Sequence, residues 1–257
     1  MIDIHTHVLP RVDDGALGLD QALAMCRAAA AAGTEVLVAT PHLLHPQWDG
    51  VTRELAARSL EALEARLEGG IELRLGAEIH MGSDLLELAD LLPGGPLVLL
   101  AGSRYLLLEM PFVPPLPDVR MIVHELVLAG WKPVLSHPER MPYWIGAPAE
   151  LTELVGLGAL LQVTAMSLTG GFGRKVLNLG RRLVDGGLVH FVASDGHDPE
   201  YRPAVMNEAH AVVRRTWGER AAQALFVDNP RAVIEDRELA SGAGDGSPEL
   251  RAMDGER

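Results

Sequence analysis

Apolar residues alternate along the chain between short continuous runs and longer stretches in which they recur every three or four positions. The first pattern is typical of buried strands, and the second predicts amphipathic helices. Gly and Pro residues mark the ends of many of these segments. The expected strands are residues 1–4, 35–40, 71–79, 105–109, 133–137, 160–164 and a run that begins at 190; the expected helices are 19–32, 51–68, 83–91, 118–129, 148–157, 173–185, 204–217 and 219–226.

Seven expected strands, each followed by helical sequence, predict an α/β fold built on a parallel barrel or barrel-like sheet. A chain of 257 residues lies within the range that such barrels occupy as one domain. Aromatic residues make up only 4% of the chain, so the core is expected to consist mainly of aliphatic side chains. We expect a single domain over residues 1–240 and a disordered tail over 241–257, where Gly, Ser and charged residues dominate.

Histidine and acidic side chains stand at the carboxyl ends of most of the expected strands. In a parallel barrel these ends converge on one mouth, which is where reactive groups lie. Imidazole and carboxylate ligands without cysteine suit Mn²⁺, Fe²⁺ or Zn²⁺. Because there are more ligands than one ion takes, we expect two or three metal ions, with Glu78 able to bridge two of them. The residues at these positions are His5, His7, His42, Glu78, Glu109, His137, Asp195 and His197.

Charge and composition narrow the class of protein. The net charge of -13 and the presence of only 22 Lys and Arg residues argue against a nucleic-acid-binding surface. Cys26 is the single cysteine, so an internal disulfide is impossible and a reducing compartment is natural. The apolar runs are interrupted well before the length that spans a bilayer. We therefore expect a soluble cytoplasmic protein without a membrane segment.

The chemistry expected of clustered divalent ions is hydrolysis, because they generate hydroxide at neutral pH and neutralise charge on a displaced oxygen. Two arginines narrow this further. Arg140 follows His137 by three residues, and Arg202 follows His197 by five. Both are expected on loops at the mouth, where a guanidinium group can bind phosphate oxygens. The sequence therefore favours a metal-dependent phosphatase.

Two other hydrolase chemistries fit the sequence less well. A cysteine-dependent phosphatase needs a Cys-x5-Arg loop, yet the sixth residue after Cys26 is Ala32 and the cysteine falls within a helix. Dinuclear amidohydrolase barrels also begin with His-x-His, but they bridge their metals with a modified lysine at the end of a strand. Lys132 precedes its strand and Lys175 lies in a helix. The first chemistry is excluded, and nothing in the sequence supports the second.

The sequence gives less specific predictions for the roles of the remaining histidines. His124, His190 and His210 fall in helices or just before a strand, and we expect structural roles for them. His80 comes two residues after Glu78, so it is a candidate either for ligation or for support of a ligand. His45 lies in a loop, and the sequence does not define its role.

Eight short motifs follow one another along the chain: Met1-Ile-Asp-Ile-His-Thr-His7, Val12-Asp-Asp-Gly15, Ala39-Thr-Pro-His42, Gly76-Ala-Glu78, Ser103-Arg-Tyr105 through Glu109, His137-Pro-Glu-Arg140, Ala193-Ser-Asp-Gly-His197 and Asp228-Asn-Pro230. In this order they resemble the bacterial metal-dependent protein tyrosine phosphatases of the polymerase-and-histidinol-phosphatase (PHP) superfamily. The resemblance is to the CpsB/CapC-like type, which is associated with capsule and exopolysaccharide synthesis, and it covers about residues 1–236.

The resemblance implies a distorted seven-stranded (β/α)7 barrel with three metal ions, Mn²⁺ being favoured over Fe²⁺ or Zn²⁺. It adds Asp14, which the strand-end pattern does not find. It also implies that Arg140 and Arg202 bind the phosphoryl group, and that the substrate is the phosphotyrosine tail of a bacterial tyrosine autokinase that controls polysaccharide export. The implied ligand sets are His5, His7, Glu78 and Asp195 for one ion, Glu78, Glu109 and His137 for a second, and Asp14, His42 and His197 for a third.

Departures from the family pattern leave alternatives open. The basic residue or second histidine that often follows the motif histidine is replaced by Leu43 and Leu44, with His45 displaced. The metal set also suits a small-molecule phosphatase of the histidinol-phosphate kind. A metal-binding scaffold module without activity is a third possibility, although all nine implied ligands are present. The sequence predicts neither a general acid nor the number of subunits.

Overall fold

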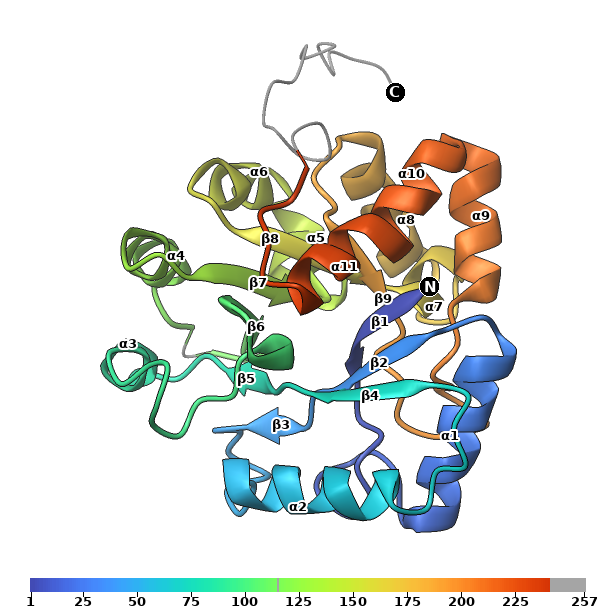
Figure 1. Ribbon diagram of the computed structural model, residues 1–257. Helices are drawn as coiled ribbons and strands as arrows, with labels where there is room; N and C mark the ends of the chain where they lie inside the picture. The colour runs from blue at the N-terminus through green and yellow to red at the C-terminus, as the bar shows by residue number, and fades with distance from the viewer. Residues whose placement is uncertain (115, 241–257) are drawn as a thin grey trace.

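A computed structural model describes residues 1–114 and 116–240 (Figure 1). All strand pairings in it are parallel. One sheet has the order β1-β2-β4 and the other the order β3-β5-β6-β7-β8-β9. The strands are β1 Ile2–Thr6, β2 Val36–Ala39, β3 His42–Leu43, β4 Glu72–Leu75, β5 Glu78–His80, β6 Tyr105–Glu109, β7 Lys132–Ser136, β8 Leu160–Thr164 and β9 Phe191–Ala193.

Hydrogen bonds between the first and last strands close the two sheets into a barrel. The backbone N–H of Asp195 donates to the carbonyl of His5 at 2.9 Å, and the N–H of His7 donates to the carbonyl of Gly196 at 2.8 Å. Strand β2 continues into β3, and β4 continues into β5, after short breaks. When β2 with β3 and β4 with β5 are each counted as one interrupted strand, the barrel has seven strands. The expected parallel barrel is confirmed.

The breaks in these two strands differ from the sequence-based expectation. A single strand over residues 71–79 was expected, but Gly76 and Ala77 separate β4 from β5. A Cβ atom on Gly76 would lie 3.0 Å from side-chain atoms of Leu100 and Val38, so the chain passes too close to its neighbours for a larger residue. The breaks move β3 and β5 into the second sheet, which distorts the barrel.

Helices lie around the outside of the barrel (Figure 1). The expected helices are present with shifted ends; that over residues 51–68 ends at Glu64, and that over 204–217 begins only at Asn207, four residues after Pro203. Helices α5, α7 and α11 were not expected. The helices are α1 Leu19–Ala31, α2 Arg53–Glu64, α3 Leu85–Ala89, α4 Val119–Leu128, α5 Pro142–Gly146, α6 Ala149–Gly156, α7 Ala165–Thr169, α8 Arg174–Asp185, α9 Asn207–Trp217, α10 Glu219–Gln223 and α11 Asn229–Ile234, with single turns η1 Leu100–Gly102, η2 Pro138–Arg140 and η3 Ala224–Asp228.

The core consists of an inner cluster inside the barrel and an outer cluster between strands and helices. Strand β6 shows how residues divide between them. Tyr105 and Leu107 belong to the inner cluster, whereas Leu106 and Leu108 belong to the outer one. Because side chains alternate along a strand, Glu109 has the same inward parity and ends the strand at the barrel mouth.

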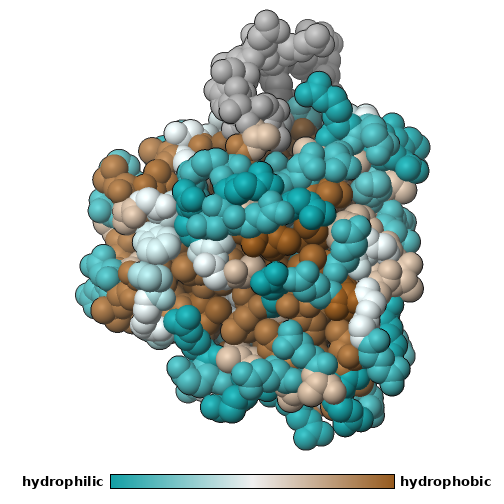
Figure 2. All heavy atoms as spheres, in the orientation of Figure 1, coloured by the Kyte–Doolittle hydropathy of each residue, from teal (hydrophilic) through white to brown (hydrophobic). Residues whose placement is uncertain are grey.

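Hydrophilic and apolar side chains gather on different parts of the visible surface (Figure 2). In Figure 2, hydrophilic side chains dominate the face formed by helices α1 and α2, and apolar atoms show between them and helix α11. No helix in residues 1–114 and 116–240 is long and apolar enough to cross a membrane. The tail expected over residues 241–257 lies outside the described residues, and the domain boundary at 240 stays a prediction.

Candidate metal centre

The nine candidate metal ligands converge at the carboxyl ends of the strands. All of them are buried except Asp14, whose side chain is 42% exposed. A cavity of about 170 Å³ opens there. Both candidate arginines line it, together with Asp14, His42, Glu78, Glu109, His137, Asp195 and His197. Residues from distant parts of the sequence thus share one pocket. We expected this for the residues that follow the ends of the strands.

The first ligand group surrounds the end of β1. His5 Nε2 lies 3.4 Å from Glu78 Oε1 and 3.5 Å from Asp195 Oδ1. His7 Nε2 lies 3.4 Å from Glu78 Oε2 and 3.6 Å from the same Asp195 oxygen. Metal bonds of about 2.1 Å separate two ligand atoms by about 3.4 Å in a tetrahedral site. The spacing of these four side chains therefore matches ligands of one ion.

The second group shares Glu78 with the first. His137 Nε2 lies 2.9 Å from Glu78 Oε1 and 3.8 Å from Glu109 Oε1. His42 approaches the same carboxylates from another side, with its Nδ1 3.2 Å from Glu78 Oε2. Both oxygens of Glu78 therefore face imidazole nitrogens, which is the arrangement expected of a bridging carboxylate.

The third group contains Asp14 from the loop after β1. Asp14 Oδ1 lies 3.4 Å from His42 Nε2 and 3.5 Å from His197 Nε2. His7 also has a nitrogen within reach of this group. Asp14 does not stand at the end of a strand, so strand-end reasoning missed it, and only the resemblance pointed to it.

Two buried side chains orient the first pair of histidines. Asp13 Oδ2 lies 2.8 Å from His7 Nδ1, and Gln162 Oε1 lies 2.9 Å from His5 Nδ1. Both partners accept the proton on Nδ1, which leaves Nε2 of each ring to face the acids. The sequence reasoning did not identify these two roles. The motif offers two adjacent acids, Asp13 and Asp14, but no local sign of which one supports His7.

The charges in the pocket are strongly coupled. Burial raises the pKa of Glu78, but the charges of His5 and His137 more than offset this, and its pKa lies well below the usual value. Asp195 is likewise held ionised against burial, by His5, Arg202 and Arg140. Burial alone would lower the pKa of His7. The charge and the hydrogen bond of the Asp13 carboxylate act in the opposite direction, and the resulting pKa is about 9. The acids are therefore ionised and suited to bind cations, which would displace the histidine protons.

The two arginines lie on one wall of the cavity. Arg140 Nη1 donates to Asp195 Oδ2, and Arg202 Nη2 donates to the same oxygen at 2.7 Å. The ring of Phe172 lies 4.5 Å from the guanidinium carbon of Arg140 and 5.8 Å from that of Arg202. Among the described residues, Arg202 Nε has no hydrogen-bond partner. Donors for an anion therefore stand directly beside the metal-ligand groups.

Comparison with known proteins agrees with this geometry. The family model described as "Capsular polysaccharide synthesis, CpsB/CapC" matches residues 1–235. The chain belongs to this family. Its similar relatives include tyrosine-protein phosphatase YwqE of Bacillus subtilis, 34% identical over 93% of each chain. Tyrosine-protein phosphatase CpsB of Streptococcus pneumoniae is 30% identical over 92% of this chain and 99% of the relative.

Solved structures support the fold of this CpsB/CapC-family chain. A crystal structure from work on YwqE of B. subtilis and CpsB of S. pneumoniae, described as metal-dependent tyrosine phosphatases, superposes with a TM-score of 0.82 at 32% identity. It covers 93% of this chain and 96% of its own. The lactonase Lmo2620 from Listeria monocytogenes superposes with a TM-score of 0.56 at 12% identity, which shows a shared barrel-type fold only.

Two non-glycine residues at the mouth have left-handed backbones. His137 has φ 33° and Asp195 has φ 52°, and each comes directly after or close to the end of a strand. Such a backbone costs about 1–3 kcal/mol for an ordinary residue. In this CpsB/CapC-family chain the two strained positions both belong to the ligand groups, which is where strain is usually retained.

The other histidines divide as the structure places them. His124 is exposed on α4. His190 is buried and accepts a hydrogen bond from the N–H of Leu161, and His210 packs against Phe226. None of these three belongs to a ligand group. His45 and His80 both lie near Glu109 at the edge of the pocket.

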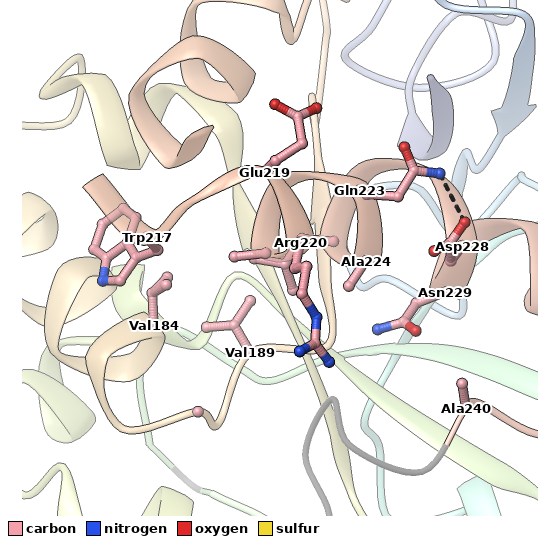
Figure 3. Close-up of a pocket in the computed structure, with 13 residues that line it drawn as sticks. Val184, Val189, Trp217, Glu219, Arg220, Gln223, Ala224, Asp228, Asn229 and Ala240 are labelled. Atoms are coloured by element: carbon pink, nitrogen blue, oxygen red, sulfur yellow. Dashed lines mark hydrogen bonds between the residues drawn. The ribbon is translucent and has the colours of Figure 1, made fainter. Parts of the chain in front are cut away.

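A larger cavity, of about 740 Å³, lies elsewhere in the molecule (Figure 3). Val184, Val189 and Trp217 form part of its apolar lining, and Figure 3 shows Arg220 reaching across it. No histidine lines it and no described metal-ligand group contains one of its residues. The smaller cavity, which holds the ionised acids and both arginines, is therefore the candidate functional site.

Proposed function

We propose that this chain hydrolyses phosphotyrosine on a protein, with divalent metal ions as cofactors. One observation carries the proposal: two guanidinium groups and several overlapping groups of potential metal ligands lie in or beside one small cavity. Guanidinium groups match the oxygens of a phosphate, and clustered divalent ions promote hydrolysis of phosphate esters. The names of the CpsB and YwqE relatives support the same activity.

The chemistry of the donor set fits divalent ions. Three atoms in these groups, His42 Nδ1, His137 Nδ1 and Glu109 Oε2, are buried without a hydrogen-bond partner in the described chain. We assign His5, His7, Glu78 and Asp195 to one ion, Glu78, Glu109 and His137 to a second, and Asp14, His42 and His197 to a third. Mixed nitrogen and oxygen donors suit Mn²⁺, which we favour, and also Fe²⁺ or Zn²⁺. When bound, such ions activate water and neutralise charge on the phosphoryl oxygens.

Arg140 and Arg202 bind the phosphoryl group in this proposal. Their side chains are 17% and 25% exposed, so both are mostly buried, and both line the cavity. Asp195 anchors both groups, which fixes their orientation before substrate arrives. Preorganised donors of this kind stabilise charge that develops on the equatorial oxygens in the transition state.

Aromatic side chains beside the arginines favour an aryl phosphate. Phe172 contacts both guanidinium groups, and Phe112 lies 5.9 Å from that of Arg140. Phe112 is 43% exposed at the cavity, so its ring is available to a substrate. A phenyl ring bound there would gain offset or edge-to-face contacts. The phenolate leaving group, with a reference pKa of about 10, departs without strong acid assistance, so we assign no general acid.

The protein partner that we infer is the phosphotyrosine tail of a bacterial tyrosine kinase that controls polysaccharide export, with the reaction in the cytoplasm. An exposed apolar segment next to the pocket would contact such a peptide. Val113 is 71% exposed directly after Phe112, and Tyr201 is 80% exposed directly before Arg202. Histidinol phosphate, the small-molecule alternative, would give these exposed side chains no role in substrate binding.

A comparison of two substrates tests the proposal. The metal-loaded enzyme should hydrolyse a phosphotyrosyl peptide with a kcat/KM at least 100-fold above that for histidinol phosphate. A ratio near one or below would favour the small-molecule phosphatase. Absence of turnover on both substrates, with metal ions bound at full stoichiometry, would favour a scaffold module.

A further inference from the structure

A further group of potential ligands lies at the edge of the pocket, where two histidines outside the three assigned sets approach Glu109 of the second set. It consists of His45 from the loop after β3, His80 at the end of β5 and Glu109 at the end of β6. We propose that this group binds an additional cation of the Zn²⁺ class. The inference depends on the proposed function only through Glu109, which would bridge the second ion and this one.

The distances within the group suit a metal ion better than hydrogen bonds. Glu109 Oε2 lies 3.7 Å from His80 Nδ1 and 3.9 Å from His45 Nε2. Both separations exceed the range of a hydrogen bond. They lie a few tenths of an ångström above the separation of about 3.4 Å between two ligands in a tetrahedral zinc site. Small side-chain movements would therefore complete the site.

Two of these atoms are orphaned in the described chain. Glu109 Oε2 and His80 Nδ1 are buried and have no hydrogen-bond partner. The Glu109 side chain is only 6% exposed, so water reaches its oxygen poorly. A buried polar atom without a partner is destabilising. One cation between the two atoms would satisfy both at once.

The carboxylate of Glu109 has an oxygen for each ion. Its Oε1 lies 3.8 Å from His137 Nε2, on the side of the second ligand set. Its Oε2 faces His80 and His45 and also lies 3.6 Å from His42 Nδ1. A bridging carboxylate divides its oxygens between two metals in this way. The additional ion would therefore lie beside the three-ion centre without displacing it.

The donor set selects the class of ion. Two imidazole nitrogens and one carboxylate oxygen match the three-ligand zinc sites that leave a coordination position open. Ions later in the divalent series, including Zn²⁺, bind such nitrogen donors more tightly than Mn²⁺ does. His45 lines the cavity, so the open position would face the pocket. We therefore assign this site to Zn²⁺, even where Mn²⁺ occupies the other sets.

Binding has one local cost. The backbone N–H of Gln47 donates to His45 Nδ1 at 3.2 Å, which places the proton of the neutral ring on Nε2. Coordination through Nε2 requires that proton to move, and the hydrogen bond to Gln47 is lost. The loss is that of one exposed hydrogen bond, which is small beside the gain from a metal–ligand bond. The loop at this point is not part of a helix or strand, so it can adjust.

Metal stoichiometry tests the inference on the full-length protein. Wild type, His45→Gln, His80→Gln and the control His124→Gln would be saturated with Zn²⁺, freed of loose metal and measured by elemental analysis. His124 is an exposed histidine on α4, so its replacement removes an imidazole far from the pocket. We expect each pocket variant to bind one Zn²⁺ fewer than wild type, and the control to bind the same number. Equal stoichiometry in all four proteins would overturn the inference.

Anomalous diffraction from zinc-loaded wild-type crystals gives a second test that needs no variant. We expect a peak between His45, His80 and Glu109, separate from those at the other ligand sets. Full zinc occupancy of the other sets with no peak at this position would overturn the inference. Neither measurement uses phosphatase activity, so the inference can fail while the proposed function stands. A zinc peak at this site in a protein without phosphatase activity would contradict only the proposed function.

Discussion

Asp13 tests how the candidate metal ligands are oriented, because it belongs to none of the three assigned ligand sets but lies in hydrogen-bond contact with His7. Its Oδ2 lies 2.8 Å from His7 Nδ1 and accepts the backbone N–H of His42 at 2.9 Å, while Oδ1 accepts the N–H of Gly15 at 3.0 Å. The change Asp13→Asn keeps the shape of the side chain. It removes the charge and replaces one acceptor oxygen by a donor.

The expected loss follows from two opposing effects. Carboxylates that orient a ligand histidine contribute roughly 10–100-fold in metal affinity, or about 1.4–2.7 kcal/mol. Against this, the charge of Asp13 raises the pKa of His7 to about 9, so at pH 7 a metal must displace a proton from that ring. Removal of the charge lowers that pKa and reduces the competition. We therefore expect a loss of about tenfold at pH 7, growing toward about 100-fold near pH 9.

Competition with a chromogenic chelator at the two pH values measures this loss. Asp20→Asn is a matched control, because it removes the same charge from an exposed position in the first turn of α1. We expect the control to match wild type at both values. An Asp13→Asn protein with wild-type affinity at pH 9, where proton competition at His7 is much weaker than at pH 7, would refute the role assigned to Asp13.

Three further predictions concern the arginines, the aromatic wall and the core. Arg202→Ala should keep its bound metal but lose about 100- to 1,000-fold in kcat on aryl phosphates, as expected for removal of a preorganised donor; unchanged kinetics would remove Arg202 from the site. Phe112→Ala should reduce kcat/KM for a phosphotyrosyl peptide about 3- to 10-fold, the worth of one aromatic contact, and leave that for an alkyl phosphate within twofold; an equal loss on both would show that Phe112 only supports Arg140. Burial lowers the pKa of His190 from 6.5 to about 4. As the pH falls, the unfolded chain therefore takes up a proton at this ring before the native chain does. The free energy of unfolding should fall by about 3 kcal/mol as the pH drops from 6.5 through 4. Urea denaturation of wild type and His190→Gln across that range checks this, and identical pH dependence in the two proteins would contradict it.

The sequence predicted the barrel and most of the pocket because both follow from local pattern. Runs such as residues 105–108 are apolar throughout, which indicates a strand buried on both faces. A polar residue at the end of such a run, as with Glu109, can lie only at the barrel mouth. His5, His137 and Asp195 were found by the same reasoning.

The sequence did not predict features that depend on tertiary contacts. Asp13 and Asp14 are adjacent acids in a loop, and nothing local indicates that one supports His7 while the other faces His42 and His197. The role of Gln162 depends on a neighbour 157 positions away. The break at Gly76 likewise reflects side chains that pack against it from other elements.

The most direct test of the central claim is hydrolysis of a phosphotyrosyl peptide by protein stripped of metal and then restored with Mn²⁺, Fe²⁺ or Zn²⁺. We expect that stripped protein releases no phosphate above background, and that at least one of these ions restores turnover as two or three equivalents bind. Hydrolysis by the stripped protein at the full rate would contradict this claim.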